Sequence, residues 1–299
     1  MLEKLIKFKN FKWVDIVNPT AEVVDAIIKE YNFHELDREA ILEEDQTARI
    51  DTYPGYVFIV LHFPKYDTRS QRYLTNEFNI FLSKDYLITV RYYQSGTMDR
   101  LHDRFESEAP GTSGELLYEV IDHMIDKVFR TLDRFGRDLR TMEKWLFATG
   151  SRGGKNLIQG MMIKKRNIIT LKHMVKPQIA AIKIIELRMK SIFGESLEVY
   201  FENLDDKIQK IAAEIELLHE NIESMESTLK TLFDLETNST IKYLTIFSAF
   251  MLPLTLITSF YGMNVEHVPF HDGVVFSSII GLLVGLFGVL LYLRLKWHI

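Results

Sequence analysis

The sequence contains no cysteine, and this absence excludes several kinds of site at once. Disulfide bonds, cysteine-ligated zinc, iron–sulfur clusters and thiol catalysis all need that residue. An excess of positive charge is also missing, since 36 basic and 41 acidic residues among 299 give a net charge of −5. We therefore expect no nucleic-acid partner, because proteins that bind nucleic acids carry strongly basic surfaces. The first residues mix charged and apolar side chains and lack the apolar stretch of a signal peptide.

The common sequence signatures of enzymes are missing too. We find no nucleophile-elbow, His-Glu-x-x-His or EF-hand pattern. The segment 150–156 (GSRGGKN) is similar to a phosphate-binding loop, but its spacing is one residue short and asparagine stands where serine or threonine is required. We interpret it as a turn between two helices. We expect a protein that is not an enzyme and that needs no cofactor.

Charged residues become scarce after residue 239, where only five acidic or basic side chains remain. The preceding part holds 33 basic and 39 acidic side chains, so a highly charged part is followed by an apolar one. Two stretches of the apolar part lack Asp, Glu, Lys, Arg and His altogether: 21 residues from Tyr243 to Met263, and 20 from Val274 to Leu293. Because about 20 helical residues cross a bilayer, we predict two membrane spans.

The connection between the two spans has only ten residues, 264–273, which forces an antiparallel hairpin. It carries no Lys or Arg, whereas Lys230, Lys242, Arg294 and Lys296 flank the other ends of the spans. Positively charged flanks mark the cytoplasmic side of a membrane protein. We therefore expect a multi-pass protein of the plasma (inner) membrane that contacts lipid, with its loop outside and both termini in the cytoplasm.

The first hundred residues alternate strand-like and helix-like stretches, which predicts a small α/β domain. Strands are expected at 11–17, 55–63, 77–82 and 86–91, and helices from the N-cap Thr20 to about 31, at 36–45 and at 97–107. Strand patterns nearly vanish from residue 114 onward. The predicted parts are a cytoplasmic α/β domain (1–112), a long helical hairpin that packs on the stalk (113–193), a cytoplasmic stalk helix (194–242), a first membrane helix (243–263), an extracellular loop (264–273), a second membrane helix (274–293) and a basic cytoplasmic tail (294–299).

Between Gly194 and Pro253 lie 58 residues without glycine or proline. Apolar residues recur there in alternating steps of four and three, which predicts a long helix with a heptad seam. Such a seam packs against helices of the same chain or of another chain, and the periodicity does not separate these two cases. Since Ile241 and Leu244 lead directly into the first span, we expect the stalk and that span to form one helix. The seam residues are Leu204, Ile208, Ile211, Ile215, Leu218, Ile222, Met225, Leu229 and Leu232.

One face of the first span combines apolar and hydroxyl side chains and contains no charge. Its residues follow one another in steps of 3, 4, 4, 3 and 4. Helix packing is one interpretation, because Ser and Thr often lie at helix contacts in membranes. A pore is the other, if several copies surround an axis; Leu244 and Leu252 would then be hydrophobic constrictions that gate by dewetting. The candidate pore-lining residues are Ile241, Leu244, Ser248, Leu252, Thr255 and Ser259.

The first span ends in Tyr261-Gly262-Met263-Asn264. Here the chain resembles the CorA-type magnesium and divalent-cation channel family, whose signature is Gly-Met-Asn at this place. Further matches are Lys242, Leu244-Thr245-Ile246 and Pro253-Leu254-Thr255, in the order and spacing of that family's pore helix, together with Trp13-Val14-Asp15-Ile16 and Asn18-Pro19-Thr20 near the N-terminus. The resemblance is strong over residues 195–299 and is compatible with the organisation of the whole chain.

The resemblance implies a funnel-shaped homopentamer, in which the stalk helix becomes the pore lining and the second membrane helix lies outside it. Gly262, Met263 and Asn264 would form the outer mouth, with five Asn264 side chains around the opening. Mg²⁺ gives up its waters reluctantly, so oxygen acceptors that bind those waters suit it. The implied function is potential-driven uptake of divalent cations, most of all Mg²⁺, with Co²⁺, Ni²⁺ and Zn²⁺ as further candidates and the cytoplasmic domain as the gate.

The family also uses intracellular Mg²⁺, bound between cytoplasmic domains, to hold the pore shut. Mg²⁺ is therefore expected both as the transported ion and as a regulatory ligand. At the stalk position of the family's acidic ligand this chain has Asn203, which departs from the pattern. An ordinary solvated acidic surface is the competing interpretation of the nearby carboxylates. The candidate regulatory ligands are Glu39, Glu43, Glu44, Asp45, Asp205 and Asp206.

The outer loop departs from the family as well, since the usual Met-Pro-Glu-Leu reads Val268-Pro269-Phe270-His271 here. Imidazole groups in this loop suit Zn²⁺, Co²⁺ or Ni²⁺. A transporter of those ions from the same family is thus an alternative, although the family's zinc branch typically carries valine where Met263 stands. The candidate metal ligands of the loop are Glu266, His267, His271 and Asp272.

A two-span coiled-coil membrane receptor is an alternative from a different class. The stalk would suit a receptor equally well. The hydroxyl face that ends in Gly262-Met263-Asn264 separates the two hypotheses, because a membrane anchor has no use for it.

Overall fold

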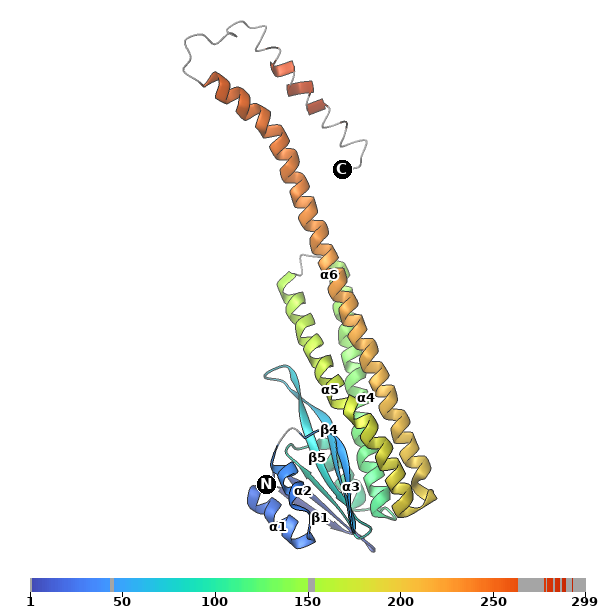
Figure 1. The fold of residues 1–299 in the computed structure, drawn as a ribbon. Helices are drawn as coiled ribbons and strands as arrows, with labels where there is room; N and C mark the ends of the chain where they lie inside the picture. Colours follow the sequence, from blue (N-terminus) through green and yellow to red (C-terminus); the bar gives the residue numbers. More distant parts are fainter. Residues whose placement is uncertain are drawn as a thin grey trace. The chain divides into compact units, whose positions relative to one another are not determined.

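The computed structural model describes residues 2–43, 46–149 and 154–262, and in the C-terminal segment positions 277, 279–281, 283–285, 287, 288 and 292. The chain divides into two units, Met1–Leu229 and Lys230–Ile299. Figure 1 shows the first unit as a sheet flanked by helices.

A six-stranded mixed sheet forms the centre of the first unit. Its order is β1-β2-β6-β5-β4-β3, and β2 and β6 are its parallel pair while every other neighbouring pair is antiparallel. β4 and β5 are rich in β-branched and aromatic residues and bury both faces, which is why they read as continuous apolar runs. The strands are β1 (Leu2–Lys7), β2 (Lys12–Val17), β3 (Arg49–Tyr53), β4 (Tyr56–Asp67), β5 (Arg72–Leu82) and β6 (Tyr86–Arg91).

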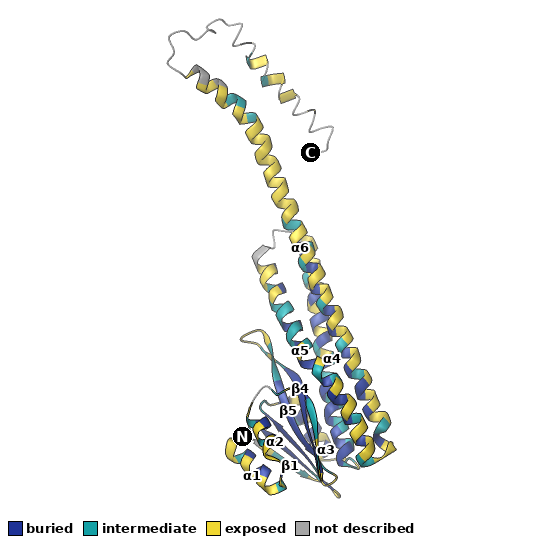
Figure 2. Cartoon of the chain, in the orientation of Figure 1, coloured by how far each residue is buried: buried dark blue, intermediate teal, exposed yellow. Residues whose placement is uncertain are grey.

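Helices cover both faces of this sheet, and each face has its own apolar core (Figure 2). On one face, α1 (Ala21–Tyr31) and α2 (Glu35–Leu42) pack on side chains such as Phe58 and Phe81. The opposite face, which includes Trp13 and Phe78, is covered by the remaining helices. These are α3 (Gly96–Phe105), α4 (Ser113–Thr149), α5 (Gly154–Phe193), the short 3-10 helix η2 (Glu195–Leu197) and α6 (Glu198–Tyr261).

The heptad seam of α6 packs within its own chain. All eight seam residues from Leu204 to Leu229 are buried, and those from Leu204 to Ile222 share one core with α4, α5 and the sheet. Ion pairs border this seam, among them Lys207–Asp122 and Lys172–Glu216, both with a nitrogen–oxygen distance of 2.6 Å. The question that periodicity left open is therefore answered for these residues in favour of a contact inside the chain.

A tight corner between α5 and α6 depends on glycine. Gly194 ends α5 with a φ of 82°, in the left-handed region, and its N–H donates to the carbonyl of Lys190 at 3.0 Å. Gly114 at the start of α4 faces this corner, where a Cβ would lie only 2.7 Å from Leu197 Cδ1. The corner brings α4 and the start of α6 together, which positions the seam.

The expected α/β domain followed by a long helix is confirmed, with differences at the element ends. β6 has the predicted bounds, whereas the strand expected at 55–63 extends to Asp67 and the one at 77–82 begins at Arg72. β1 and β3 were not predicted. The helix expected at 36–45 ends at Leu42, because Glu43 has an extended backbone with a ψ of 97°.

Candidate functional site

The candidate pore-lining residues all lie on the part of α6 that belongs to the second unit. Each is exposed in the single chain, with Leu244 at 63% and Leu252 at 68% of full exposure. The most apolar stretch of this helix is not buried anywhere in the chain. Within the described residues, one helix is long and apolar enough to cross a membrane, and it is this one. An exposed apolar helix of this length needs a covering of lipid or of further protein.

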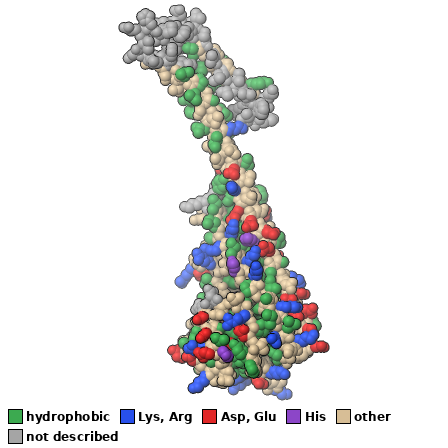
Figure 3. All heavy atoms as spheres, in the orientation of Figure 1, with side chains coloured by type: hydrophobic (Ala, Val, Ile, Leu, Met, Phe, Trp, Pro, Cys, Tyr) green, Lys and Arg blue, Asp and Glu red, His purple; other side chains and the backbone are tan. Residues whose placement is uncertain are grey.

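The two units differ in what their surfaces display (Figure 3). Figure 3 shows many acidic and basic side chains on the first unit and hydrophobic side chains along the far end of the long helix. In the sequence, this helix carries no acidic or basic residue after Lys242. This contrast places the apolar surface on the residues from which the span was predicted.

Hydroxyl groups on this helix bond to its own backbone. Thr255 Oγ1 donates to the carbonyl of Met251 at 2.9 Å, and Thr245 Oγ1 donates to that of Ile241 at 2.8 Å. Each hydroxyl proton is thereby satisfied without a second helix, while the hydroxyl oxygen keeps lone pairs that can accept from water. Such a face can offer acceptors to a hydrated cation without carrying a fixed charge.

The helix ends at Tyr261, and Gly262 forms the turn that follows. The N–H of Gly262 donates to the carbonyl of Thr258 at 2.9 Å, and a Cβ at this position would lie 3.1 Å from that same oxygen. Glycine therefore suits the close approach of the chain to the last helical turn. The other predicted residues of the mouth and loop, namely Met263, Asn264, Glu266, His267, His271 and Asp272, lie outside the described residues.

The second predicted span is described only in part. Its described positions are helical, and Phe287 packs edge-on against Phe250 of α6 with ring centroids 6.0 Å apart. A Cβ added at Gly281, Gly285 or Gly288 would meet no described atom within 4 Å. These three glycines thus leave room for a close neighbour.

The candidate regulatory carboxylates are not brought together within one chain. Glu39 and Glu43 are exposed on and beside α2, while Asp205 and Asp206 belong to α6 on the opposite face of the sheet. Glu44 and Asp45 lie outside the described residues. Among the described residues, no group of three or more His, Asp or Glu side chains is arranged to hold a metal ion.

Asp205 differs from the other carboxylates because it is buried. Its Oδ2 accepts a hydrogen bond from Gln209 Nε2 at 3.0 Å and lies 3.6 Å from Lys183 Nζ. Its Oδ1 is buried and has no partner in the part of the chain that is described. Asp206, next along the helix, is exposed. Of the two regulatory candidates on α6, Asp205 and Asp206, only Asp206 is exposed to a ligand from solution.

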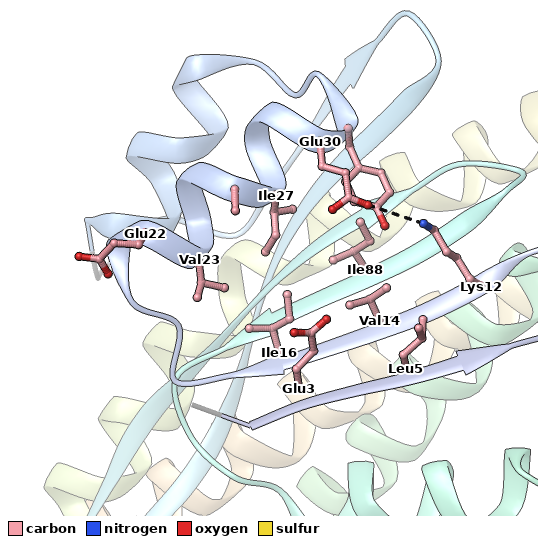
Figure 4. Close-up of a pocket in the computed structure, with 12 residues that line it drawn as sticks. Glu3, Leu5, Lys12, Val14, Ile16, Glu22, Val23, Ile27, Glu30 and Ile88 are labelled. Carbon is pink, nitrogen blue, oxygen red and sulfur yellow. Dashed lines mark ion pairs between the residues drawn. The ribbon is translucent and has the colours of Figure 1, made fainter.

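A cavity of about 330 Å³ lies between α1 and the strands β1, β2 and β6 (Figure 4). Its floor is apolar, formed by side chains such as Val14 and Ile16, and Glu30 at its rim pairs with Lys12 at 3.9 Å. Glu3 and Glu22 are the other acidic lining residues, and Figure 4 shows them apart from Glu30. The cavity therefore offers no converging set of metal ligands.

Sequence reasoning missed a buried polar cluster beneath the parallel strand pair. Asp15 on β2 is fully buried and bonds to Arg91, Thr89 and His102. Burial raises the pKa of Asp15, but the hydrogen bonds from His102, Arg91 and Thr89 and the charge of Arg91 outweigh it and lower the pKa to about 2. An aspartate inside an apolar strand was the available signal. The cluster holds β2, β6 and α3 together rather than facing solution.

Comparison with known proteins finds relatives that match nearly the whole chain. Residues 8–296 match the family described as "CorA-like Mg2+ transporter protein". The chain is 23% identical to the "Cobalt/magnesium transport protein CorA" of Thermotoga maritima, over 90% of this chain and 78% of that protein. It is 22% identical to the "Putative metal ion transporter YfjQ" of Bacillus subtilis, over 92% of this chain and 85% of that protein.

Solved structures of two full-length proteins share the fold. The CorA magnesium transporter of Methanocaldococcus jannaschii superposes with a TM-score of 0.80 at 17% identity, covering 96% of this chain and 92% of that one. The full-length CmaX protein superposes with a TM-score of 0.78 at 18% identity, covering 94% of this chain and 88% of that one.

The family match decides against the receptor hypothesis, because it spans the sheet domain, the long helix and the apolar C-terminal segment alike. The chain belongs to the CorA-like Mg²⁺ transporter family and is a membrane transporter of divalent cations.

Proposed function

We propose that the protein takes up Mg²⁺ through a pore lined by the hydroxyl-bearing face of α6. The observation that carries this proposal is the exposed, uncharged stripe of pore-lining candidates from Ile241 to Ser259, which Gly262, Met263 and Asn264 follow in the sequence. Relatives named as cobalt and magnesium transporters support the choice of ion.

A pore of this kind requires several copies of the chain. One stripe on one helix encloses nothing, whereas five helices around an axis turn it into a channel. In the proposed homopentamer, Leu244 and Leu252 form hydrophobic constrictions, and rings of Ser248, Thr255 and Ser259 hydroxyls lie at other levels of the pore. The second span packs outside, with both termini in the cytoplasm, as the positive flanking residues favour.

The outer mouth would recognise Mg²⁺ with its waters in place. Removal of water from Mg²⁺ is slow and unfavourable, so a site that binds the hydrated ion avoids that step. The amide oxygens of five Asn264 side chains can accept from the waters of the ion and leave it weakly enough bound to pass on. A membrane potential of 100 mV supplies about 2.3 kcal/mol per charge, hence about 4.6 kcal/mol for a divalent ion.

Feedback by intracellular Mg²⁺ would act between neighbouring copies. Glu39 and Glu43 lie on the opposite face of the sheet from Asp206, so ligands from both groups can meet only when they come from different chains. Bound Mg²⁺ would then bridge two first units and stabilise the closed assembly. Loss of that ion would release them.

The outer-loop histidines support a second candidate function. His267 and His271 stand four residues apart in the sequence, beside Glu266 and Asp272, and imidazole is a favoured ligand for Zn²⁺, Co²⁺ and Ni²⁺. Preferential transport of one of these ions would make the loop a selectivity site. Met263 favours the magnesium proposal, because the zinc branch of the family typically has valine there.

The absence of cysteine permits a direct test of the pore-lining stripe. Single Ser248→Cys and Thr255→Cys variants, reconstituted in liposomes, should react with a water-soluble, membrane-impermeant thiol reagent, and the reaction should block cation flux. Matched controls are Phe247→Cys and Leu256→Cys, which are exposed in the single chain but lie off the stripe. We expect these controls to face lipid and to react about tenfold more slowly or not at all. Equal reactivity on and off the stripe would contradict the proposed pore lining.

A further inference from the structure

A second cavity, of about 670 Å³, lies in the first unit between the outer part of the β4–β5 hairpin and the helices α4 and α5. This volume is within the usual range for small-molecule sites, roughly 300–1,000 Å³. The outer part of the hairpin contributes Lys65, Tyr66 and Tyr73. None of the candidate pore-lining residues or candidate metal ligands is among the residues that line this cavity.

The charged side chains around the cavity are mostly cationic. Five basic residues and a single carboxylate, Asp138, line it, although the chain as a whole has a net charge of −5. The basic residues come from three elements: Lys65 from β4, Lys127, Arg130 and Arg134 from α4, and Lys164 from α5.

Most of these cations lack a counter-ion. Asp138 is paired with Lys164. Lys65 lies over the ring of Tyr93, with its ammonium 3.7 Å from the ring centroid. In the described part of the chain, Lys65, Lys127, Arg130 and Arg134 form no ion pair. Four positive charges thus share one concave space without a neutralising carboxylate.

The three cations of α4 lie on one helical face at spacings of three and four. Like charges at these spacings repel and disfavour the helix. Burial, followed by the charges of Arg100, Arg91, Arg130 and Lys65, lowers the pKa of Lys127. The arrangement is therefore electrostatically unfavourable in the chain by itself, and an anion in the cavity would relieve it.

We propose that this cavity binds a small polyphosphate anion, either free or as part of a nucleotide. An arginine guanidinium can bind two phosphate oxygens at once, and lysines add point charges, so the four unpaired cations suit a ligand with several phosphate groups. The concave shape favours a small molecule over a nucleic-acid strand or a flat lipid surface. Tyr66 and Tyr73, whose ring centroids are 5.1 Å apart, offer an aromatic wall for a base.

The test is calorimetric titration of the purified full-length protein in detergent, without divalent cations, using inorganic triphosphate and ATP as probes. We expect saturable binding of one ligand per chain. The Arg130→Glu and Arg134→Glu double variant should weaken binding by about tenfold or more, because it replaces two phosphate-binding charges. Both arginines are exposed, so the fold should tolerate the change. If the glutamate double variant does not fold, the milder Arg130→Gln and Arg134→Gln double variant replaces it in the same titration.

A matched control is available on the same helix. Arg137 and Lys144 are exposed on α4 and do not line the cavity, so Arg137→Glu with Lys144→Glu makes the same change in net charge. We expect this control to bind like the unmodified protein. Absence of saturable binding, or an equal loss in both double variants, would overturn the proposal. Tighter binding of ATP than of triphosphate would support a nucleotide and equal binding a free polyphosphate. Because binding is measured directly, failure here leaves the proposed transport function untouched.

Discussion

Replacement of Asn264 by alanine is expected to reduce Mg²⁺ uptake into liposomes by about tenfold or more, because the mouth loses its ring of amide oxygens. Alanine keeps the backbone but offers no side-chain acceptor to the waters of the ion. The measurement is the initial rate of uptake at a Mg²⁺ concentration below saturation, under a negative-inside potential.

Asn238→Ala is the matched control for this substitution. Asn238 is an exposed asparagine of α6 and precedes the uncharged run that begins at Tyr243. We expect this variant to transport at the unmodified rate. An Asn264→Ala protein that is folded and still takes up Mg²⁺ at the unmodified rate would show that the amide does not recognise the ion.

The largest expected effect on stability comes from Asp15→Asn in the first unit. Asp15 Oδ2 accepts from an Arg91 guanidinium nitrogen at 2.7 Å, and Thr89 Oγ1 donates to Oδ1 at 2.7 Å. Arg91 is fully buried, so the substitution leaves an unpaired charge in the core. Loss of one partner of a buried ion pair costs about 3–5 kcal/mol, which corresponds to a fall in the thermal unfolding midpoint of roughly 6–20 °C.

Asp25→Asn is a control of the same chemistry at the surface. Asp25 pairs with the side chain of Arg38 at 2.5 Å, and its side chain is 51% exposed. Exposed ion pairs contribute little because water and salt screen them. We therefore expect a small change in the unfolding midpoint for Asp25→Asn. Similar changes in both variants would contradict the role given to the buried pair.

The same cluster predicts a dependence of stability on pH. Its hydrogen bonds and the charge of Arg91 lower the pKa of Asp15 to about 2, from an ordinary value of 3.8. Because the folded-state pKa is the lower one, this contribution to stability is complete above about pH 4 and is lost as the pH falls through about 2. In Asp15→Asn this part of the acid sensitivity should disappear.

Elements with strong internal patterns could be predicted from the sequence, and those that depend on a neighbour could not. β6 is a short apolar run, and α6 carries the heptad seam from Leu204 to Leu232 and the pore-lining candidates from Ile241 to Ser259. β1 and β3 are the two edge strands of the sheet and carry charged residues, so their strand character comes from pairing with β2 and β4. A single sequence shows no sign of that pairing.

The outer part of the β4–β5 hairpin, which lines the cationic cavity, was not predicted as strand. Polar residues and Pro64 interrupt the apolar run, which ended the predicted strand at Phe63. In the structure the pairing continues, with Pro64 opposite Thr75 and Asp67 opposite Arg72. This extension supplies one wall of the cationic cavity. The cavity was therefore absent from the sequence analysis, because its residues come together only through tertiary structure.

For the heptad seam and for the stripe, the sequence predicted the spacing of the residues but not the partner against which they pack. The spacing of both was evident from the sequence, but the seam's partner was not, and the structure shows it to be α4 and α5 of the same chain. The stripe remains exposed in the single chain, so its partner is not within the described residues. Copies of the same helix are the partner that the proposed pore requires.

Potential-driven ion uptake by the unmodified protein tests the central claim most directly. Purified protein in liposomes should take up Mg²⁺ faster under a negative-inside potential than without one, since a divalent ion gains about 4.6 kcal/mol per 100 mV. Parallel measurements with Co²⁺, Ni²⁺ and Zn²⁺ rank the ions, and preference for Zn²⁺ would move the selectivity site to the outer-loop histidines. Mg²⁺ uptake that rises with the potential is the predicted result. Folded protein that passes none of these ions at any potential would contradict the account.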